Sequence, residues 1–111
     1  MRKLVLTSHF RRSLRKFIKH DQNLQARIEE TLQQMEIDLF AVNLATHQLK
    51  GEFDGLRACS CGYDCRIIFS IEKDDETGEE IVVILSHIPH PKMLQREITE
   101  MKIKGSIKTN R

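Results

Sequence analysis

The segment HQLKGEFDGLRACSCGYDCRIIFSI, residues 47–71, concentrates side chains that can bind anions, transfer protons or hold a metal. It contains one histidine, one lysine, two arginines and three cysteines within 25 residues. Three kinds of site fit this composition: a cationic site for phosphate, a metal site, or a hairpin whose polar side chains have no ligand. Each makes a different demand on the spacing of the residues.

The cationic residue types match the requirements of metal-free RNA cleavage. Attack of a 2′-OH on its own phosphate needs one group that accepts the hydroxyl proton and one that protonates the leaving 5′-oxygen. It also needs fixed positive charge beside the phosphorane as it forms. Histidine titrates near neutral pH, and arginine binds two phosphate oxygens through its planar guanidinium. The composition therefore fits a ribonuclease that needs no cofactor and no metal.

The expected positions of these residues allow them to meet. On a strand over residues 65–71, Ile67, Phe69 and Ile71 form the better core face, so Arg66 is expected to point outward from the middle of a sheet. His47 and Lys50 directly precede the strands, and His87 and His90 follow the last one. We expect a compact sheet to bring this set to one rim.

The three cysteines, Cys59, Cys61 and Cys65, favour packing over metal binding. An odd count argues against a disulfide framework and fits a reducing cytosol. Zinc requires four ligands, commonly with two to four residues between paired cysteines, whereas a single residue separates Cys59 from Cys61. A zinc site completed by a histidine is the less favoured alternative, and small buried apolar side chains are the expected role.

Length and composition indicate one globular domain. The chain has 111 residues, of which 31% are charged and 40% hydrophobic, which fits neither a disordered tail nor a membrane protein. The longest apolar run, residues 81–85, is too short to cross a bilayer, and no signal-peptide pattern follows the basic N-terminus. We therefore expect a cytoplasmic protein with no membrane partner, with a single domain over residues 1–101 and a basic, flexible tail over residues 102–111.

Charge is segregated along the chain despite a net charge of only +2. Residues 1–20 and 101–111 are basic, and the acidic residues collect in the middle, above all in EKDDETGEE, residues 72–80. Two basic ends suit a polyanionic partner, because clustered cations release counterions on binding phosphate. RNA contacts are expected from Arg11 and Arg15 in the first helix and from Lys102 and Lys104 in the tail. The alternative is that these side chains only solvate an exposed surface.

Hydrophobic periodicity predicts an α+β domain with the order β-α-α-β-β-β-(α). A strand over residues 3–7 leads through a Thr7 or Ser8 cap into a first amphipathic helix, and Asp21 caps a second. Short turns then join three strands into an antiparallel meander, and the two helices form a hairpin that packs on one face of that sheet. The expected strands cover residues 55–61, 65–71 and 80–87, and a last short helix covers residues 91–101.

Two short motifs and their spacing resemble the RelE/ParE superfamily of bacterial type II toxins. The motifs are HQLKG, residues 47–51, and DCRIIF, residues 64–69, with Gly55, Arg57 and Gly62 between them. The resemblance spans roughly residues 3–94, and within the superfamily it points to the RelE/YafQ-like mRNA interferases. It implies a toxin that cuts mRNA in the ribosomal A site and that an acidic, RelB-like antitoxin neutralises. It also implies that the chain meets DNA only through that antitoxin.

The resemblance assigns roles to residues by position. His47 and Lys50 match residues for proton transfer or phosphate contact, and Arg57 and Arg66 match residues that stabilise the transition state. His90 matches a C-terminal catalytic histidine, for which His87 could substitute. The following segment, IPHPKML, departs from the family pattern, because Leu94 replaces an aromatic residue that stacks on a base. Loss of base stacking is expected to weaken substrate placement.

Two other functions share this resemblance. One is a ParE-like inhibitor of DNA gyrase, which binds its target without catalysis. The other is a catalytically silent protein of the same fold that only binds an antitoxin. The motifs do not separate these alternatives from the interferase, because gyrase-poisoning members of the superfamily have the same fold.

Overall fold

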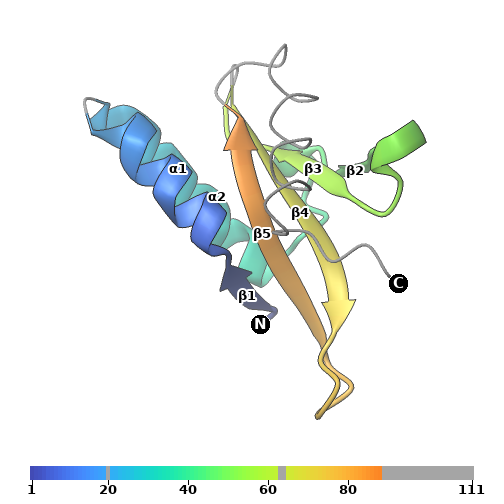
Figure 1. The fold of residues 1–111 in the computed structure, drawn as a ribbon. Helices are drawn as coiled ribbons and strands as arrows, with labels where there is room; N and C mark the ends of the chain where they lie inside the picture. The colour runs from blue at the N-terminus through green and yellow to red at the C-terminus, as the bar shows by residue number, and fades with distance from the viewer. Residues whose placement is uncertain (20, 63–64, 89–111) are drawn as a thin grey trace.

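A computed structural model describes residues 1–19, 21–62 and 65–88, which form an α+β fold of two layers (Figure 1). The expected helix over residues 91–101 and the basic tail lie outside these described residues, as does His90. The elements are β1 (Lys3–Leu6), α1 (Ser8–Ile18), α2 (Gln22–Ile37), β2 (His47–Gln48), β3 (Arg57–Ser60), β4 (Arg66–Lys73) and β5 (Glu80–Ile88), with 3-10 turns at Val42–Leu44 and Gly51–Phe53.

The sheet confirms the predicted fold class and extends it. Its strand order is β1-β5-β4-β3-β2, and β3, β4 and β5 form the predicted antiparallel meander. β1 joins as a parallel strand beside β5, with Lys3 opposite Ile81 and Leu6 opposite Ile84, so the sheet is mixed. The sequence pattern missed β2, because a strand of two residues is defined by its pairing with β3 and carries no periodicity of its own.

Both helices begin at the predicted caps. The Thr7 hydroxyl accepts a hydrogen bond from the backbone N–H of Phe10 at 3.1 Å and donates one to the carbonyl of Ile84 at 2.9 Å. Asp21 accepts from the N–H of Leu24 at 3.0 Å. Each cap satisfies a donor that the first helical turn leaves unpaired, and Thr7 also ties α1 to β5.

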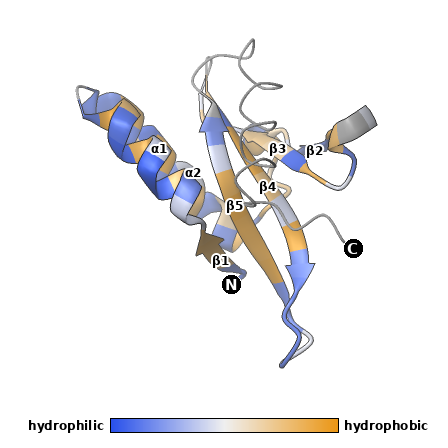
Figure 2. Cartoon of the chain, viewed as in Figure 1, coloured by the Kyte–Doolittle hydropathy of each residue, from blue (hydrophilic) through white to orange (hydrophobic). Residues whose placement is uncertain are grey.

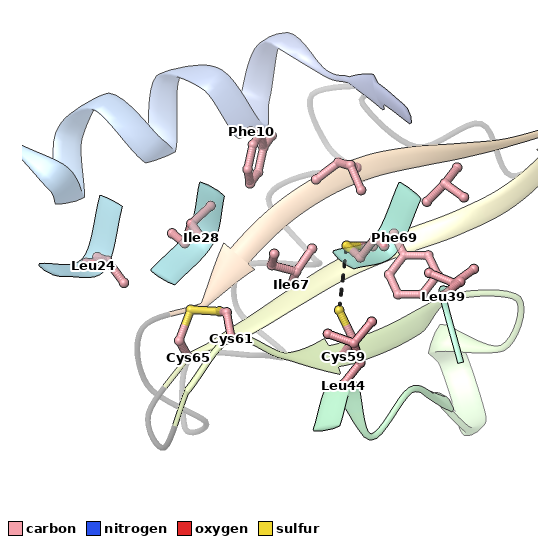
Figure 3. Packing of buried hydrophobic residues seen from close by; sticks show 13 residues of the cluster. Phe10, Leu24, Ile28, Leu39, Leu44, Cys59, Cys61, Cys65, Ile67 and Phe69 are labelled. Atoms are coloured by element: carbon pink, nitrogen blue, oxygen red, sulfur yellow. Dashed lines mark hydrogen bonds between the residues drawn. A yellow bond between two sulfur atoms is a disulfide. The ribbon is translucent and has the colours of Figure 1, made fainter. Parts of the chain in front are cut away.

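The main core lies between the helices and one face of the sheet, which we call the helix face (Figure 3). Phe10 from α1 and Ile28 and Met35 from α2 are fully buried, and they meet Ile67 and Phe69 from β4. In Figure 2 each helix carries both apolar and polar residues, whereas the middle of β5 is apolar throughout. This pattern follows from burial, because a helix covers the core with one stripe and a central strand can bury both faces.

The opposite face of the sheet, which we call the second face, carries a smaller buried cluster. Its members are Leu49, Leu56, Ala58, Ile68 and Leu85. Val82 and Ile84 of β5 belong to the helix face, so β5 is buried on both faces, as its unbroken apolar run predicted.

A β-bulge interrupts the β4–β5 ladder and changes the face of the residues that follow it. Phe69 pairs with Ile84, but Ile68 pairs with Ser86, which leaves Leu85 as the extra residue of β5. Strict alternation along β5 would place residue 87 on the second face. The bulge places His87 on the helix face, opposite Ile67.

The cysteines correct the expectation, based on their odd count, that the chain has no disulfide framework. Cys61 and Cys65 form a disulfide across the turn between β3 and β4, with their Cα atoms 5.0 Å apart (Figure 3). Cys59 is free and fully buried, and its thiol donates to the Met35 sulfur at 3.8 Å. All three belong to the main core, so their burial was predicted correctly, but the spacing alone did not reveal the pairing, which depends on the turn geometry.

Among the described residues, the helices are too short and too polar for any of them to traverse a lipid bilayer.

Candidate functional site

Arg66 is the first residue of β4 and lies on the second face. It pairs across the ladders with Ser60 and Ile88, and its side chain is half-buried. The prediction that Arg66 faces away from the core face of Ile67 and Phe69 is confirmed, and β4 is the central strand of the sheet, although Arg66 lies at the start of this strand beside the turn. Its Nη1 donates to the carbonyl oxygen of Gly62 at 3.0 Å and to that of Cys65 at 2.8 Å.

The described residues beside Arg66, residues 60–62 and Cys65, are held by several contacts. The disulfide joins Cys61 to Cys65, and the N–H of Cys61 also donates to the carbonyl of Cys65 at 3.1 Å. Gly62 has a φ of 138°, and the Arg27 guanidinium occupies the space that a Cβ on this glycine would need. The Ser60 hydroxyl donates to the Gly62 carbonyl at 3.1 Å. Arg66 is thus bonded to the carbonyls of Gly62 and Cys65, two residues that other contacts hold in place.

His47 and Lys50 lie at the β2 edge of the sheet and are exposed. His47 pairs with Ala58, so it faces the same side as Arg66. Its Nδ1 lies 3.0 Å from the carbonyl oxygen of Ala45. Lys50 immediately precedes the 3-10 turn Gly51–Phe53. Both side chains are accessible to a ligand.

Arg57 lies on the helix face. It pairs with Phe69, which belongs to the main core, and its guanidinium carbon lies 6.0 Å from the centre of the Phe40 ring. Arg57 and Arg66 therefore lie on opposite faces of the sheet. The sequence gives no reason to pair Arg57 with Phe40, because the contact joins β3 to the loop after α2.

His87 is fully buried in the main core. Its ring centre lies 5.2 Å from that of Phe17 and 6.2 Å from that of Phe10, and both contacts are edge-on. The expectation that His87 joins the rim with Arg66 is therefore wrong, and the physical reason is the bulge at Leu85. His90 lies outside the described residues.

The electrostatics of Cys59 argue against a reactive thiol. Burial raises the pKa of this thiol from its ordinary value of 9.0 to about 12, although the positive charge of Arg66 acts in the opposite direction. The thiol is therefore neutral at physiological pH and acts as a packing group. Within residues 1–19, 21–62 and 65–88, no three histidine, cysteine or acidic side chains are grouped to hold a metal ion.

Comparisons with known proteins place this geometry in a known fold. No protein-family model matches the chain. No curated protein matches it either. Solved structures do match. The YoeB/ParE toxin from Agrobacterium tumefaciens superposes with a TM-score of 0.63 and 16% identity over 78% of this chain and 96% of its own. YafQ from E. coli strain BL21(DE3) superposes with a TM-score of 0.65 and 10% identity over 85% of this chain and 98% of its own.

The chain has a RelE/ParE-like toxin fold. A third match, the E. coli DinJ-YafQ toxin-antitoxin complex, has a TM-score of 0.59 and 10% identity over 78% of this chain and 90% of that one. At these identities the match shows the shared fold of the YafQ and YoeB type.

The RelE/ParE-like sheet divides the expected catalytic residues into two groups. His47 and Arg66 share the second face, with Lys50 at its edge, whereas Arg57 and His87 belong to the helix face. Arg11 and Arg15 are exposed on α1, and their RNA contact stays a prediction. Lys102 and Lys104 lie outside the described residues. Arg27, which packs against Gly62 beneath the Arg66 turn, was not identified from the sequence, because its position depends on how α2 docks on the sheet.

Proposed function

We propose that the chain is the toxin of a type II toxin-antitoxin system and cleaves mRNA on the ribosome. The observation that carries the proposal is the position of Arg66, which presents a guanidinium on the same face as His47 in a RelE/ParE-like fold. The natural partners are then the ribosome, its mRNA and an antitoxin, all reached in the cytoplasm. The DinJ-YafQ toxin-antitoxin complex supports the antitoxin, because its fold matches this chain.

Arg66 would stabilise the phosphorane. A guanidinium has five N–H donors, and Nη1 uses its two on the carbonyls of Gly62 and Cys65. The other donors, on Nη2 and Nε, form no hydrogen bond with the described residues. Those donors can bind two phosphate oxygens while Nη1 keeps the group in place. Positioning before the reaction is what makes such charge effective.

His47 would accept the proton of the 2′-OH. A neutral imidazole that donates from Nδ1 to the Ala45 carbonyl has an unprotonated Nε2, which is the proton acceptor that the first step needs. Lys50, exposed three residues later, would contact the phosphate or protonate the leaving 5′-oxygen. His87 has no direct role in this scheme, because it is buried behind the sheet.

Primer extension on an mRNA in a purified translation system tests the proposal. We expect the wild-type chain to produce cuts at codon positions only when ribosomes are present. Arg66→Ala should reduce the cutting rate by roughly two to three orders of magnitude, the usual cost of a lost transition-state contact. Arg66→Lys keeps the charge but loses the planar fork, so it should retain part of the rate. No cuts from a folded wild-type chain would contradict the proposal.

The separation of Arg57 and His87 from Arg66 favours a second candidate, a RelE/ParE-like protein that binds its target without cutting RNA. DNA gyrase is one such target. On this alternative, expression of Arg66→Ala would arrest growth as strongly as the wild type. Inhibition of supercoiling by purified gyrase, with no mRNA cuts, would establish it in place of the interferase.

A further inference from the structure

Three apolar side chains at the end of α2 and in the loop that follows it point to solvent. Ile37, Phe40 and Val42, which we call the loop patch, are 72%, 54% and 97% exposed. Their neighbours Leu39 and Leu44 are 1% exposed, so the same loop buries some apolar side chains and leaves others outside. Single exposed apolar residues are ordinary, but three within six positions mark a contact surface.

The loop that carries the patch has a defined backbone. Asp38 accepts from the N–H of Phe40 at 3.2 Å through its side chain and from that of Ala41 at 3.2 Å through its carbonyl. The Thr46 hydroxyl donates to the carbonyl of Leu39 at 2.7 Å. A partner would therefore meet a largely formed surface and would not have to order this loop.

Two arginines flank the exposed ring of Phe40. The guanidinium carbon of Arg2 lies 5.8 Å from the ring centre and that of Arg57 lies 6.0 Å from it. Arg2 is already paired with Glu80 at 2.8 Å. The Arg57 side chain is half-buried, and its guanidinium forms no ion pair or hydrogen bond with the described residues. A half-buried cation beside an exposed aromatic ring is a favourable position for a carboxylate from outside.

We propose that the loop patch docks a protein segment that places a carboxylate on Arg57 and apolar side chains over Phe40 and Val42. This inference rests on the proposed function, because the segment would belong to the antitoxin. Nucleic acid suits the surface less well. Ile37 and Val42 have no aromatic face on which a base could stack.

The test measures binding of the short protein encoded by the reading frame adjacent to this chain's gene, by isothermal titration calorimetry. We expect Phe40→Ser and Arg57→Ala each to weaken the complex by at least about tenfold, the effect of losing an interface anchor. Phe40→Tyr keeps the ring, so this matched control should stay within about threefold of wild type. Arg57→Lys keeps the charge but loses the planar fork, so its affinity should lie between those of Arg57→Ala and the wild type. Val42→Asp places a negative charge near the carboxylate of the partner, and Val42 is too exposed for the change to affect folding. This variant should therefore also weaken binding.

The outcomes separate this inference from the proposed function. If the wild type binds and all patch variants bind equally well, the loop patch is not the docking site, although the toxin-antitoxin pairing stands. If the wild type does not bind, the inference and the antitoxin assignment both fail, and the mRNA cleavage assay still tests the activity. Two further results would also overturn the inference: a wild-type dimer that Phe40→Ser dissociates, or RNA affinity that the patch variants alone reduce.

Discussion

Arg66 and His87 lie on opposite faces of one two-stranded ladder, although an unbroken ladder would place them directly opposite each other. The pair Phe69–Ile84 defines the register of β4 and β5. If this register continued without interruption, Arg66 would pair with His87. The bulge at Leu85 shifts the register by one residue, so that Arg66 pairs with Ile88 and His87 pairs with Ile67. One extra residue thus turns a potential site histidine into a core residue.

Truncation of His87 should destabilise the fold. His87→Ala removes a ring that packs against Phe10 and Phe17, and we expect a loss of about 2–4 kcal/mol in the free energy of unfolding. His47→Ala, at an exposed position, should change that free energy by less than about 0.5 kcal/mol while it abolishes cleavage. Urea unfolding and primer extension measured on both variants check this. Equal stability of the two variants would contradict the placement of His87.

Reduction of the Cys61–Cys65 disulfide should also lower stability. The bond closes a short loop, for which the chain-entropy estimate is about 2 kcal/mol. Unfolding by urea with and without dithiothreitol measures the loss, and the double variant Cys61→Ser/Cys65→Ser should reproduce it. Because Arg66 donates to two carbonyls within this turn, we expect reduction to lower the cleavage rate as well. A wild-type midpoint that dithiothreitol leaves unchanged would refute the prediction.

Cys59 should resist alkylation in the folded chain. Its raised pKa keeps the thiol neutral, and only the thiolate reacts readily. Iodoacetamide at pH 8 should therefore leave Cys59 unmodified until denaturant is added, as mass spectrometry would show. A raised pKa means that the folded state holds this proton more tightly. The corresponding stability is complete below pH 9.0 and is lost as the pH rises toward about 12.

Loss of the Thr7 side chain should weaken the junction between α1 and β5. Thr7→Ala removes a helix cap and the hydrogen bond to Ile84, and together these should cost about 1–2 kcal/mol of unfolding free energy. Ser8→Ala is the matched control, because Ser8 is exposed and Thr7 supplies the cap. Comparable losses in both variants, measured by thermal unfolding, would show that the cap is misassigned.

The features that local chemistry determines were predictable from the sequence. The caps at Thr7 and Asp21, the two helical stripes and the core face of Ile67 and Phe69 all follow from residue type and period. The features that depend on distant residues were not predictable from the sequence. The faces of His87 and Arg57 depend on the ladder register, which a bulge can shift without any change in composition. Similarly, the contact of Arg57 with Phe40 depends on where the loop after α2 meets β3.

The parallel pairing of β1 with β5 has a consequence for the order of folding. Lys3 and Leu6 find their partners at Ile81 and Ile84, and the Arg2–Glu80 ion pair spans 78 positions. Such long-range contacts slow folding, and on the ribosome β1 must wait until β5 has been synthesised. The sheet that carries Arg66 is therefore completed late in synthesis. If the chain is an mRNA interferase, the ribosome that makes it is exposed to no folded toxin of its own until translation of this domain is nearly over.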